Sequence, residues 1–353
     1  MDVKEIPKII LAGHGPDSRG ITDRSKCLIP IRGKSSLERT IETLQGMGHT
    51  NIFLAGDRHE ITAETTIPSS IGIVHIPYSN FLQKFKELQA FFGFGQDARV
   101  LLMNGDAPFL NEESITYFID HVPDADLVME CVAHESLMLF SQYHHQTPMH
   151  FRDGRLRVGS LFLVRPARID FGHLEDILEI RKQDHARNWF PALRRAYHRL
   201  GFSAMHALAR MYPSHLCYKA GLPRTARALS FVSPRVQDIT RHAHKMIGGT
   251  VQHVTSVYAE NAIDVDFPED CAMYDAKYDE IQERIAAEHG LLSLLREDSR
   301  TGRQLIRKIA KHASPPPELE RLPLRDVIKK DFRNFKQLVE IYARENGYSD
   351  GND

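Results

Sequence analysis

This 353-residue chain has few cysteines, almost no net charge and no long apolar run. Its 4 cysteines include no C-x-x-C pair, which argues against a thiolate zinc site and against a disulfide framework. The formal net charge of -1 gives no sign of a nucleic-acid partner or of binding to an anionic membrane. No apolar run reaches the roughly 20 residues that span a bilayer, so no membrane span is expected. Charged residues occupy the start of the chain, which is unlike a signal peptide, and we expect a cytoplasmic protein.

The composition that remains is that of an ordinary globular protein, with 42% hydrophobic and 26% charged residues. A chain of this length can form one large domain and an appendage. In its first half, short apolar segments alternate with segments of helical periodicity, such as Phe81, Phe85 and Leu88. This alternation predicts a mostly parallel sheet with right-handed crossovers, which is the α/β class. We expect strands at residues 8–12, 51–55, 72–76, 100–103, 126–132 and 251–257, and a hairpin over 151–164.

One predicted strand ends at an aspartate, in the stretch 99–110 with sequence RVLLMNGDAPFL. Its compact apolar run is typical of a strand that is buried on both faces. Pro108 rules out further strand pairing, and Asn111 is placed to cap the next helix. Open α/β sheets bind ligands at the carboxyl ends of their strands. Asp106 is therefore a candidate site residue, although closing a turn would be its ordinary role.

A second acidic segment, NAIDVDFPED, covers residues 261–270. Asp264 and Asp266 flank Val265, so in an extended strand both carboxylates would point the same way. The proline and the two acids that follow are typical of a helix start. Capping that helix does not account for Asp264 and Asp266, which precede the proline, so they are candidate site residues as well.

The middle of the chain carries weaker signals. Histidines are frequent between His134 and His150, but no metal-ligand spacing occurs, so a solvated loop is favoured over a metal cluster. Residues 174–247 are expected to be mostly helical. Their basic, aromatic-rich stretch is typical of an amphipathic helix, and the balanced overall charge disfavours a nucleic-acid face.

Four segments together resemble the MobA-like nucleotidyltransferase superfamily, which includes molybdenum cofactor guanylyltransferase and the sugar-phosphate and alditol-phosphate cytidylyltransferases. The segments are LAG at 11–13, SKCLIPIRGKSSL at 25–37, MNGDAPFL at 103–110 and DVDFPED at 264–270. The residues in register with the family pattern K-x-L-x-P-x-x-G-x-P-x-L are Lys26, Leu28, Pro30, Gly33 and Leu37. The chain departs from the family at His14, where glycine is usual, and at Ser35, where proline is usual.

The resemblance implies a GT-A-type, Rossmann-like, mostly parallel sheet with a helical insertion and a helical C-terminal extension. It implies a Mg-dependent nucleotidyltransferase that joins a nucleoside monophosphate from a triphosphate, with CTP or GTP favoured, to a phosphorylated small molecule. This acceptor would be a sugar, alditol or cofactor phosphate, and pyrophosphate would be released. Catalysis would rest on positioning and charge neutralisation, because an acceptor phosphate is already ionised and no protein nucleophile is needed.

The resemblance also implies roles for individual residues. Asp106 and Asp266 would each bring one carboxylate to Mg²⁺, a hard cation that prefers oxygen ligands. Lys26 would complete the catalytic group by placing a positive charge on the phosphates. The nucleotide-binding residues would be Leu11, Ala12, Gly13, Arg19, Arg24, Lys26 and Gly105. The acceptor-binding residues would be Arg155, Arg157 and Lys182.

The expected domain organisation is a nucleotidyltransferase domain over 1–289, with the helical insertion at about 174–247, and a helical extension over 290–353. The extension has an amphipathic pattern between Leu324 and Tyr342. We expect this pattern to pack on the main domain or on a second subunit, so a homo-oligomer through the C-terminal helices is one expectation.

Two other functions stay open at this point. Nucleotide-sugar glycosyltransferases use the same sheet, but usually show D-x-D at the strand end, whereas this chain has Asn104-Gly105-Asp106. A nucleotide sensor that has lost turnover is the second alternative, and His14 in the glycine loop is the feature that favours it. Such a sensor would bind a nucleotide without releasing pyrophosphate.

Overall fold

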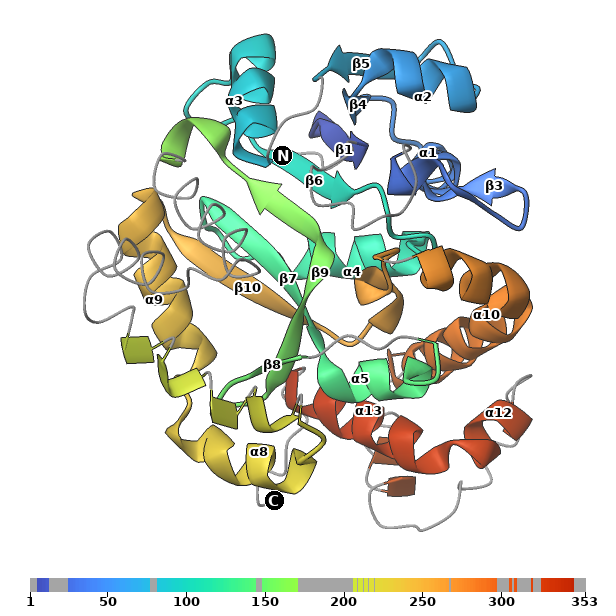
Figure 1. Ribbon diagram of the computed structural model, residues 1–353, viewed down its shortest axis with the longest axis vertical. Coiled ribbons are helices and arrows are strands. Elements are labelled where there is room, and N and C mark those ends of the chain that lie inside the picture. Colours follow the sequence, from blue (N-terminus) through green and yellow to red (C-terminus); the bar gives the residue numbers. More distant parts are fainter. Residues whose placement is uncertain are drawn as a thin grey trace.

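The computed structural model describes most of the chain, as a sheet surrounded by helices (Figure 1). The described residues are 5–12, 25–76, 81–143, 148–170, 206–266 apart from 208, 212, 215 and 219, 268–296, the positions 305, 306, 308, 309 and 319, and 325–345. Within these residues no helix is long and apolar enough to cross a membrane.

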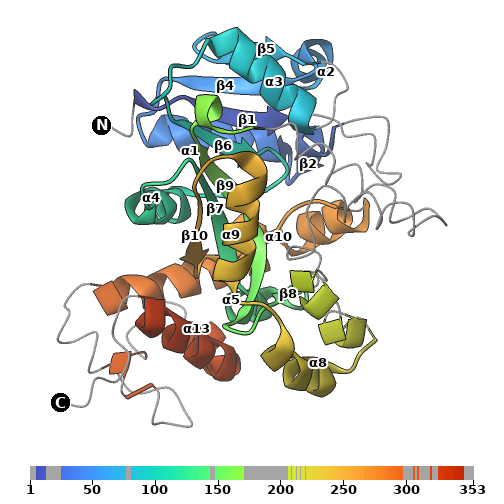
Figure 2. The same ribbon diagram turned by 90° about the vertical axis from the view of Figure 1, so that its left-hand side faces the viewer.

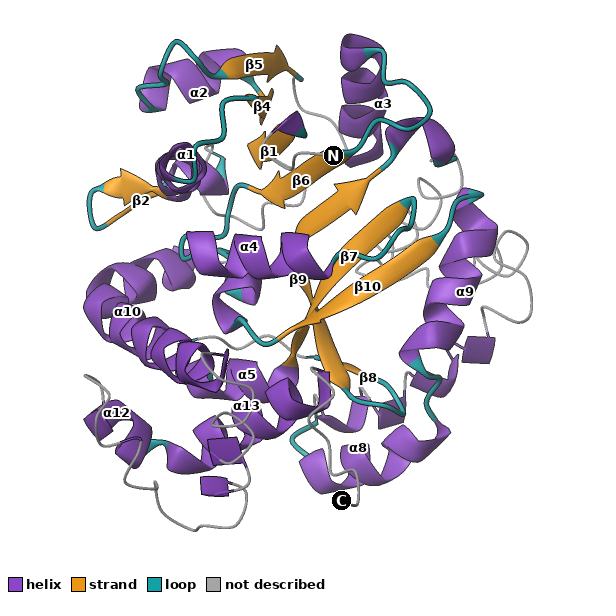
Figure 3. Ribbon diagram, turned by 180° about the vertical axis from the view of Figure 1, so that it is seen from behind, coloured by secondary structure: helices purple, strands orange, loops and turns teal. Residues whose placement is uncertain are grey.

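The centre of the molecule is an eight-stranded mixed sheet (Figure 3). Its strands are β1 (Lys8–Ala12), β4 (Ile52–Gly56), β5 (Gly72–His75), β6 (Val100–Asn104), β7 (Leu127–Ala133), β8 (Met149–His150), β9 (Arg155–Val164) and β10 (Val251–Ser256). The order is β10-β7-β9-β6-β1-β4-β5, with β8 paired to β9. Only β9 runs antiparallel to its neighbours β6 and β7 along this path, so the predicted α/β class with a mostly parallel sheet is confirmed.

Helices cover both faces of the sheet (Figure 2). They are α1 (Ser36–Gly46), α2 (Arg58–Glu64), α3 (Phe81–Phe92), α4 (Glu112–His121), α5 (His134–Leu137), α8 (Pro223–Leu229), α9 (Val236–Ile247), α10 (Pro268–Arg296), α12 (Arg325–Lys330) and α13 (Phe332–Glu345). The short 3-10 turns are η2 (Lys26–Leu28), η3 (Met138–Phe140), η4 (Pro166–Arg168), η5 (Ser230–Val232) and η6 (Ala259–Ala262), and β2 (Pro30–Ile31) pairs with β3 (Lys34–Ser35).

The sheet has an apolar core on each face, and this explains why the central strands are continuous hydrophobic runs in the sequence. Ile10 of β1 and Met103 of β6 belong to the core on the side of α1, α4 and α10, while Ile9 and Leu102 belong to the core on the side of α3 and α9. Alternate residues of one strand thus pack into different layers, and each layer needs apolar side chains.

Capping residues define where two of the helices begin. At α1 the Ser35 hydroxyl accepts from the Glu38 amide at 3.2 Å, and the Glu38 carboxylate accepts from the Ser35 amide at 2.7 Å. At α4 the Asn111 side chain accepts from the Ser114 amide at 3.1 Å. These three contacts satisfy amides that have no partner inside the helix, as the capping signals in the sequence predict.

The C-terminal helices pack on the rest of the chain. Buried residues of α13, among them Phe335 and Leu338, belong to the same core as the central strands. Arg284 of α10 reaches Asp331, just before α13, at 2.6 Å. The apolar face of α13 is therefore used within the chain, and an oligomer through these helices stays a prediction. Helix α10 runs through position 290, and the division into two domains also stays a prediction.

The segment between His134 and His150 differs from the expected solvated loop. His134 begins α5 and is 4% exposed, and His150 lies in β8 and is 1% exposed. Both rings pack near Tyr218, at 5.9 and 5.0 Å between centroids. The apolar neighbourhood lowers the pKa of His134 to about 4, so its imidazole is neutral at pH 7. For these two residues the prediction failed, because histidine spacing says nothing about a helical turn that folds back on the sheet. His144 and His145 lie outside the described residues.

A buried carboxyl group in the sheet provides a stability prediction. Glu130 of β7 is fully buried, and burial raises its pKa to about 8 despite a 2.6 Å hydrogen bond from Asn261. The unfolded chain releases this proton near pH 4.5 and the folded protein only near pH 8, so the free energy of unfolding falls as pH rises between these values. We expect Glu130→Gln, which keeps the acceptor for Asn261, to raise the melting temperature at pH 8 and to flatten this slope. Thermal unfolding between pH 5 and about 8 checks it, and an unchanged slope would contradict it.

Candidate active site

Two segments that are far apart in the sequence meet beyond the carboxyl end of β6. Gly105 and Asp106 follow β6 directly, and residues 263–266 follow η6. The Val265 amide donates to the Asp106 carbonyl oxygen at 3.0 Å, which joins the two segments. The strands β1, β4 and β6 end at this same edge, since Leu11 is in register with Asn104 and Ala12 with Gly56. This is the edge at which open α/β sheets bind ligands.

Lys26 of η2 lies between the two aspartates that the sequence singles out. Its ammonium is 3.0 Å from Asp266 Oδ1 and 3.8 Å from Asp106 Oδ2. Burial lowers the pKa of Lys26, but the attraction of Asp106 and Asp266 outweighs burial, and the net shift is upward. The lysine is therefore charged at neutral pH. The structure brings together all three residues predicted as catalytic.

Asp264 has a different partner from Asp266. Residues 263–266 do not form a strand, so the strand geometry from which both carboxylates were expected to point the same way is not present. Asp264 Oδ1 accepts from Arg157 Nη2 at 2.6 Å, and the Tyr274 hydroxyl donates to the Asp264 carbonyl oxygen at 3.1 Å. Burial raises the pKa of Asp264 to about 7, although the positive charge of Arg157 opposes this rise.

The acids form a concentrated negative cluster. Burial raises the pKa of Asp106, Lys26 lowers it, and the nearby Asp266 raises it further. Carboxylates held this close destabilise one another unless a cation lies between them. In the described residues Lys26 and Arg157 are the positive groups that face these acids.

The carboxylate pair suits a magnesium ion that also binds phosphate oxygens. One carboxylate oxygen of Asp106 and one of Asp266 face the Lys26 ammonium, so the two side chains already face a position that holds a positive charge. Within the described part of the chain, no group of three or more His, Cys, Asp or Glu residues forms a closed metal cage. Mg²⁺ needs no such cage, because it usually takes one or two carboxylates and completes its shell with phosphates and water.

The residues predicted to bind the nucleotide are described in part. Leu11 and Ala12 form the end of β1, and the Gly105 amide donates to the Leu11 carbonyl oxygen at 3.2 Å. A Cβ atom on Gly105 would lie 2.9 Å from that oxygen, so a side chain does not fit here. Gly13, Arg19 and Arg24 lie outside the described residues.

One contact on this side was not predicted from the sequence. The Ser25 amide, next to Lys26, donates to the carboxylate of Glu60 in α2. This contact fixes the chain just before Lys26. Glu60 is not part of any motif in the sequence. Its contact with Ser25 depends on the tertiary fold, which places α2 beside η2.

Two of the three residues predicted to bind the acceptor, Arg155 and Arg157, lie on β9. Arg157 points to the acid cluster through Asp264, and only 10% of its side-chain surface is exposed. Arg155 pairs with Glu135 of α5 at 2.8 Å, and 30% of its side chain is exposed. Lys182 lies outside the described residues. Arg157 is therefore part of the acid cluster, while Arg155 is held toward α5.

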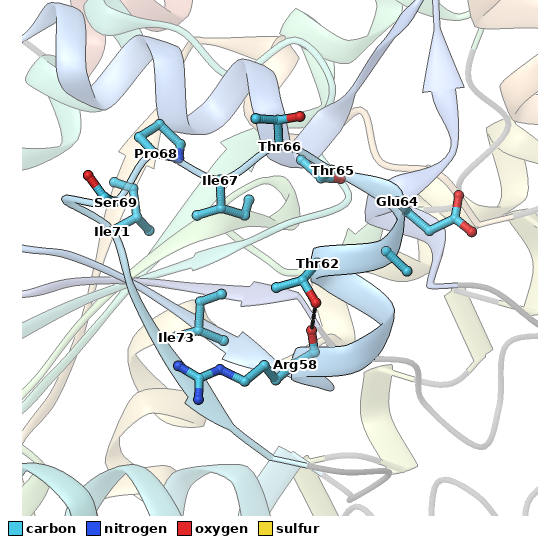
Figure 4. Close-up of a pocket in the computed structure, with 11 residues that line it drawn as sticks. Arg58, Thr62, Glu64, Thr65, Thr66, Ile67, Pro68, Ser69, Ile71 and Ile73 are labelled. Atoms are coloured by element: carbon cyan, nitrogen blue, oxygen red, sulfur yellow. Dashed lines mark hydrogen bonds between the residues drawn. The ribbon is translucent and has the colours of Figure 1, made fainter.

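Other hollows on the described surface lie away from these residues. A pocket of about 550 Å³ lies between α2, the 65–71 loop and the edge strand β5 (Figure 4). Its lining includes Arg58, Thr62 and Ile73 but none of the predicted site residues. The pocket therefore belongs to the rim of the sheet and gives no support for a second substrate site.

The comparison with protein families settles the assignment. A family profile described as the MobA-like NTP transferase domain matches residues 9–211, which is more than half of the chain. The chain belongs to the MobA-like NTP transferase family. It is therefore a nucleotidyltransferase, as the sequence motifs predicted. Asp264 and Asp266 lie beyond the matched residues, and the fold alone brings them to Asp106.

One solved structure supports the same fold for this MobA-like chain, and two others are weaker matches. A hypothetical transferase from Thermus thermophilus is 22% identical, covers 75% of this chain and 99% of its own, and gives a TM-score of 0.52. HddC from Yersinia pseudotuberculosis complexed with GMP-PN is 15% identical, with 77% and 99% covered and a TM-score of 0.40. A 4-diphosphocytidyl-2C-methyl-D-erythritol synthase from Anaerococcus prevotii is 14% identical, with 78% and 98% covered and a TM-score of 0.40. No curated protein matches the chain.

Proposed function

We propose that this MobA-like protein is a Mg-dependent nucleotidyltransferase that joins a nucleoside monophosphate to a phosphorylated small molecule and releases pyrophosphate. The acceptor would be a sugar, alditol or cofactor phosphate, and CTP or GTP would be the favoured donor. The observation that carries the proposal is the placement of Lys26 between Asp106 and Asp266 at the carboxyl end of β6.

The reaction needs no nucleophile from the protein. An oxygen of the acceptor phosphate attacks the α-phosphorus, the bond from that phosphorus to the bridging oxygen breaks, and pyrophosphate leaves with the electron pair. When bound by Asp106 and Asp266, Mg²⁺ would supply charge neutralisation on the phosphate oxygens. Lys26 adds a positive charge that Asp106 and Asp266 hold in place, and this lowers the repulsion between two anionic substrates.

The two substrates would enter from opposite sides of the acid cluster. The ends of β1 and β6, which pack closely because Gly105 has no side chain, would hold the nucleotide together with Gly13, Arg19 and Arg24. Arg157 would orient the acceptor phosphate, because Asp264 fixes its guanidinium at the edge of the cluster. Arg155 and Lys182 would contribute charge farther from the reacting atoms.

A pyrophosphate-release assay tests this proposal. Purified protein with Mg²⁺ is given each of four nucleoside triphosphates and a set of phosphorylated sugars, alditols and cofactor precursors. We expect release that depends on both one triphosphate and one class of acceptor, and that stops when EDTA removes the metal. Release that continues unchanged in EDTA would contradict the metal-dependent mechanism, and no release with any pair would contradict the proposed acceptor class.

A further inference from the structure

A buried ionic cluster lies behind the acid-bearing segments and joins three parts of the fold. His289 of α10 donates from Nε2 to Glu260 Oε1 at 2.7 Å and pairs through Nδ1 with Glu113 Oε2 at 2.9 Å. Asn111, the cap of α4, donates from Nδ2 to the same Glu260 oxygen at 2.9 Å. The Tyr258 hydroxyl donates to Glu113 Oε1 at 2.9 Å. The cluster thus links the start of α4, the turn η6 and the middle of α10.

The cluster sits on the two segments that carry the predicted metal ligands. Asn111 ends the loop that begins at Asp106, and Glu260 belongs to η6, which leads directly to Asp266. Asn111 comes five residues after Asp106, and Glu260 comes six residues before Asp266. A shift of Glu260 relative to Asn111 would therefore change the position of Asp266 relative to Asp106.

The charge of His289 makes this link strong. Glu260 is fully buried and His289 has only 16% of its side chain exposed. Burial lowers the pKa of His289, but Glu260 and Glu113 outweigh burial and raise it to about 10, so the ring is a cation at pH 7. The groups that face the ring are Glu113 of α4, Glu260 and the Tyr258 ring beside η6, and Glu288 of α10, with Arg296 next to Glu113. Burial raises the pKa of Glu288 well above its ordinary value.

We propose that His289 is a positioning residue for nucleotidyl transfer, which holds the loop after Asp106 and the turn before Asp266 in fixed register through Asn111, Glu113 and Glu260. This inference rests on the proposed function for its effect on the reaction, but its effect on the two segments is independent of it. Among the described residues, those that pair with His289 are Glu113 and Glu260, and neither is predicted to bind substrate. It acts through Glu260 and Glu113, and loss of its charge leaves a buried carboxylate without its cation.

Hydrogen exchange followed by mass spectrometry tests the proposal on the full chain without substrate. In His289→Gln we expect exchange in peptides covering 104–111 and 259–266 to rise about tenfold or more, the factor that follows from losing a hydrogen bond to a charged group. The control is Arg284→Gln, on the same helix and 7% exposed, which contacts Asp331 and the Leu139 carbonyl instead. It should leave these two peptides unchanged.

A second variant covers the case in which His289→Gln does not fold. Asn111→Ser keeps an acceptor for the cap of α4 but removes the donor to Glu260, together with a long 3.4 Å contact to the Phe109 carbonyl oxygen. The same two peptides should exchange faster. Unchanged exchange in the folded variants, or an equal increase in Arg284→Gln, would overturn the proposal.

The reaction supplies a separate readout. In His289→Gln we expect kcat to fall about tenfold to a hundredfold while KM for the triphosphate changes little, because a small misplacement of catalytic groups affects the transition state most. A KM increase with unchanged kcat would also overturn the positioning role. If the wild type transfers no nucleotide, the proposed function fails, and the exchange experiment still decides whether His289 fixes the two segments.

Discussion

Replacing Asp106 with asparagine is expected to lower kcat/KM for nucleotidyl transfer by about a thousandfold or more. Asparagine has nearly the same shape but carries no charge, so it is a poor ligand for Mg²⁺ and leaves the phosphate charge uncompensated. The backbone contact between the Asp106 carbonyl and the Val265 amide does not involve the side chain, and we expect it to persist. Steady-state pyrophosphate release at several Mg²⁺ concentrations measures the loss.

The protein should stay folded in this variant. In metal-free buffer the Asp106 carboxylate lies beside Asp266 and Asp264, and it contributes repulsion as well as its contact with Lys26. We therefore expect the melting temperature of Asp106→Asn in EDTA to equal or exceed that of the wild type. Glu269→Gln is a matched control, because it neutralises an exposed carboxylate at the start of α10. Its activity should stay within about twofold of wild type, and an equal loss in both variants would contradict the assigned role of Asp106.

Replacing Lys26 with methionine should lower kcat/KM for transfer by about a hundredfold to a thousandfold. Methionine keeps much of the apolar stem and removes the charge that lies 3.0 Å from Asp266 and 3.8 Å from Asp106. A positioned cation on the reacting phosphates contributes a loss of this order when it is removed. Lys26→Arg should recover only part of the activity, because the planar guanidinium cannot take the position of a compact ammonium.

The same variant separates two roles of Lys26. Without the ammonium, Asp106 and Asp266 repel each other in metal-free protein, so the melting temperature of Lys26→Met in EDTA should be lower than that of the wild type. Added Mg²⁺ should then stabilise the variant more than the wild type, because the metal replaces the missing charge. Thermal unfolding with EDTA and with Mg²⁺ measures both effects. Full activity of Lys26→Met would show that the lysine does not act on the phosphates.

Much of the fold was predictable because its strands are buried on both faces. The apolar runs around Ile9 and Leu102 serve two cores, and such runs are hard to confuse with loops. The capping residues Ser35 and Asn111 also predicted where their helices start, because a cap depends only on residues that are close in the sequence. What depends on tertiary packing was harder to predict. His134 and His150 are buried because α5 folds back on β9, and no local pattern indicates that.

The candidate site shows the same division. Lys26 and Asp106 belong to motifs that are visible in the sequence, and the structure places Lys26 Nζ 3.8 Å from Asp106 Oδ2. Asp264 and Asp266 were expected in a strand, but they lie in an irregular segment in which Asp264 pairs with Arg157. Glu60 and His289 carry no motif, and their importance follows from partners that lie far away in the sequence. Spacing rules therefore predicted residues that lie together in the structure and missed the residues that hold them in place.

Isotope tracing tests the central claim most directly. Protein with Mg²⁺ and the active acceptor is given the triphosphate labelled with ³²P either at the α-phosphate or at the γ-phosphate. The account predicts that the α label appears in the acceptor product and the γ label in pyrophosphate, with both lost in Asp106→Asn. A γ label in the acceptor product would show phosphoryl transfer. A nucleotide sugar with a labelled sugar is tested separately. If its sugar is transferred while neither phosphate label of the triphosphate is released, the protein is a glycosyltransferase and the account is contradicted.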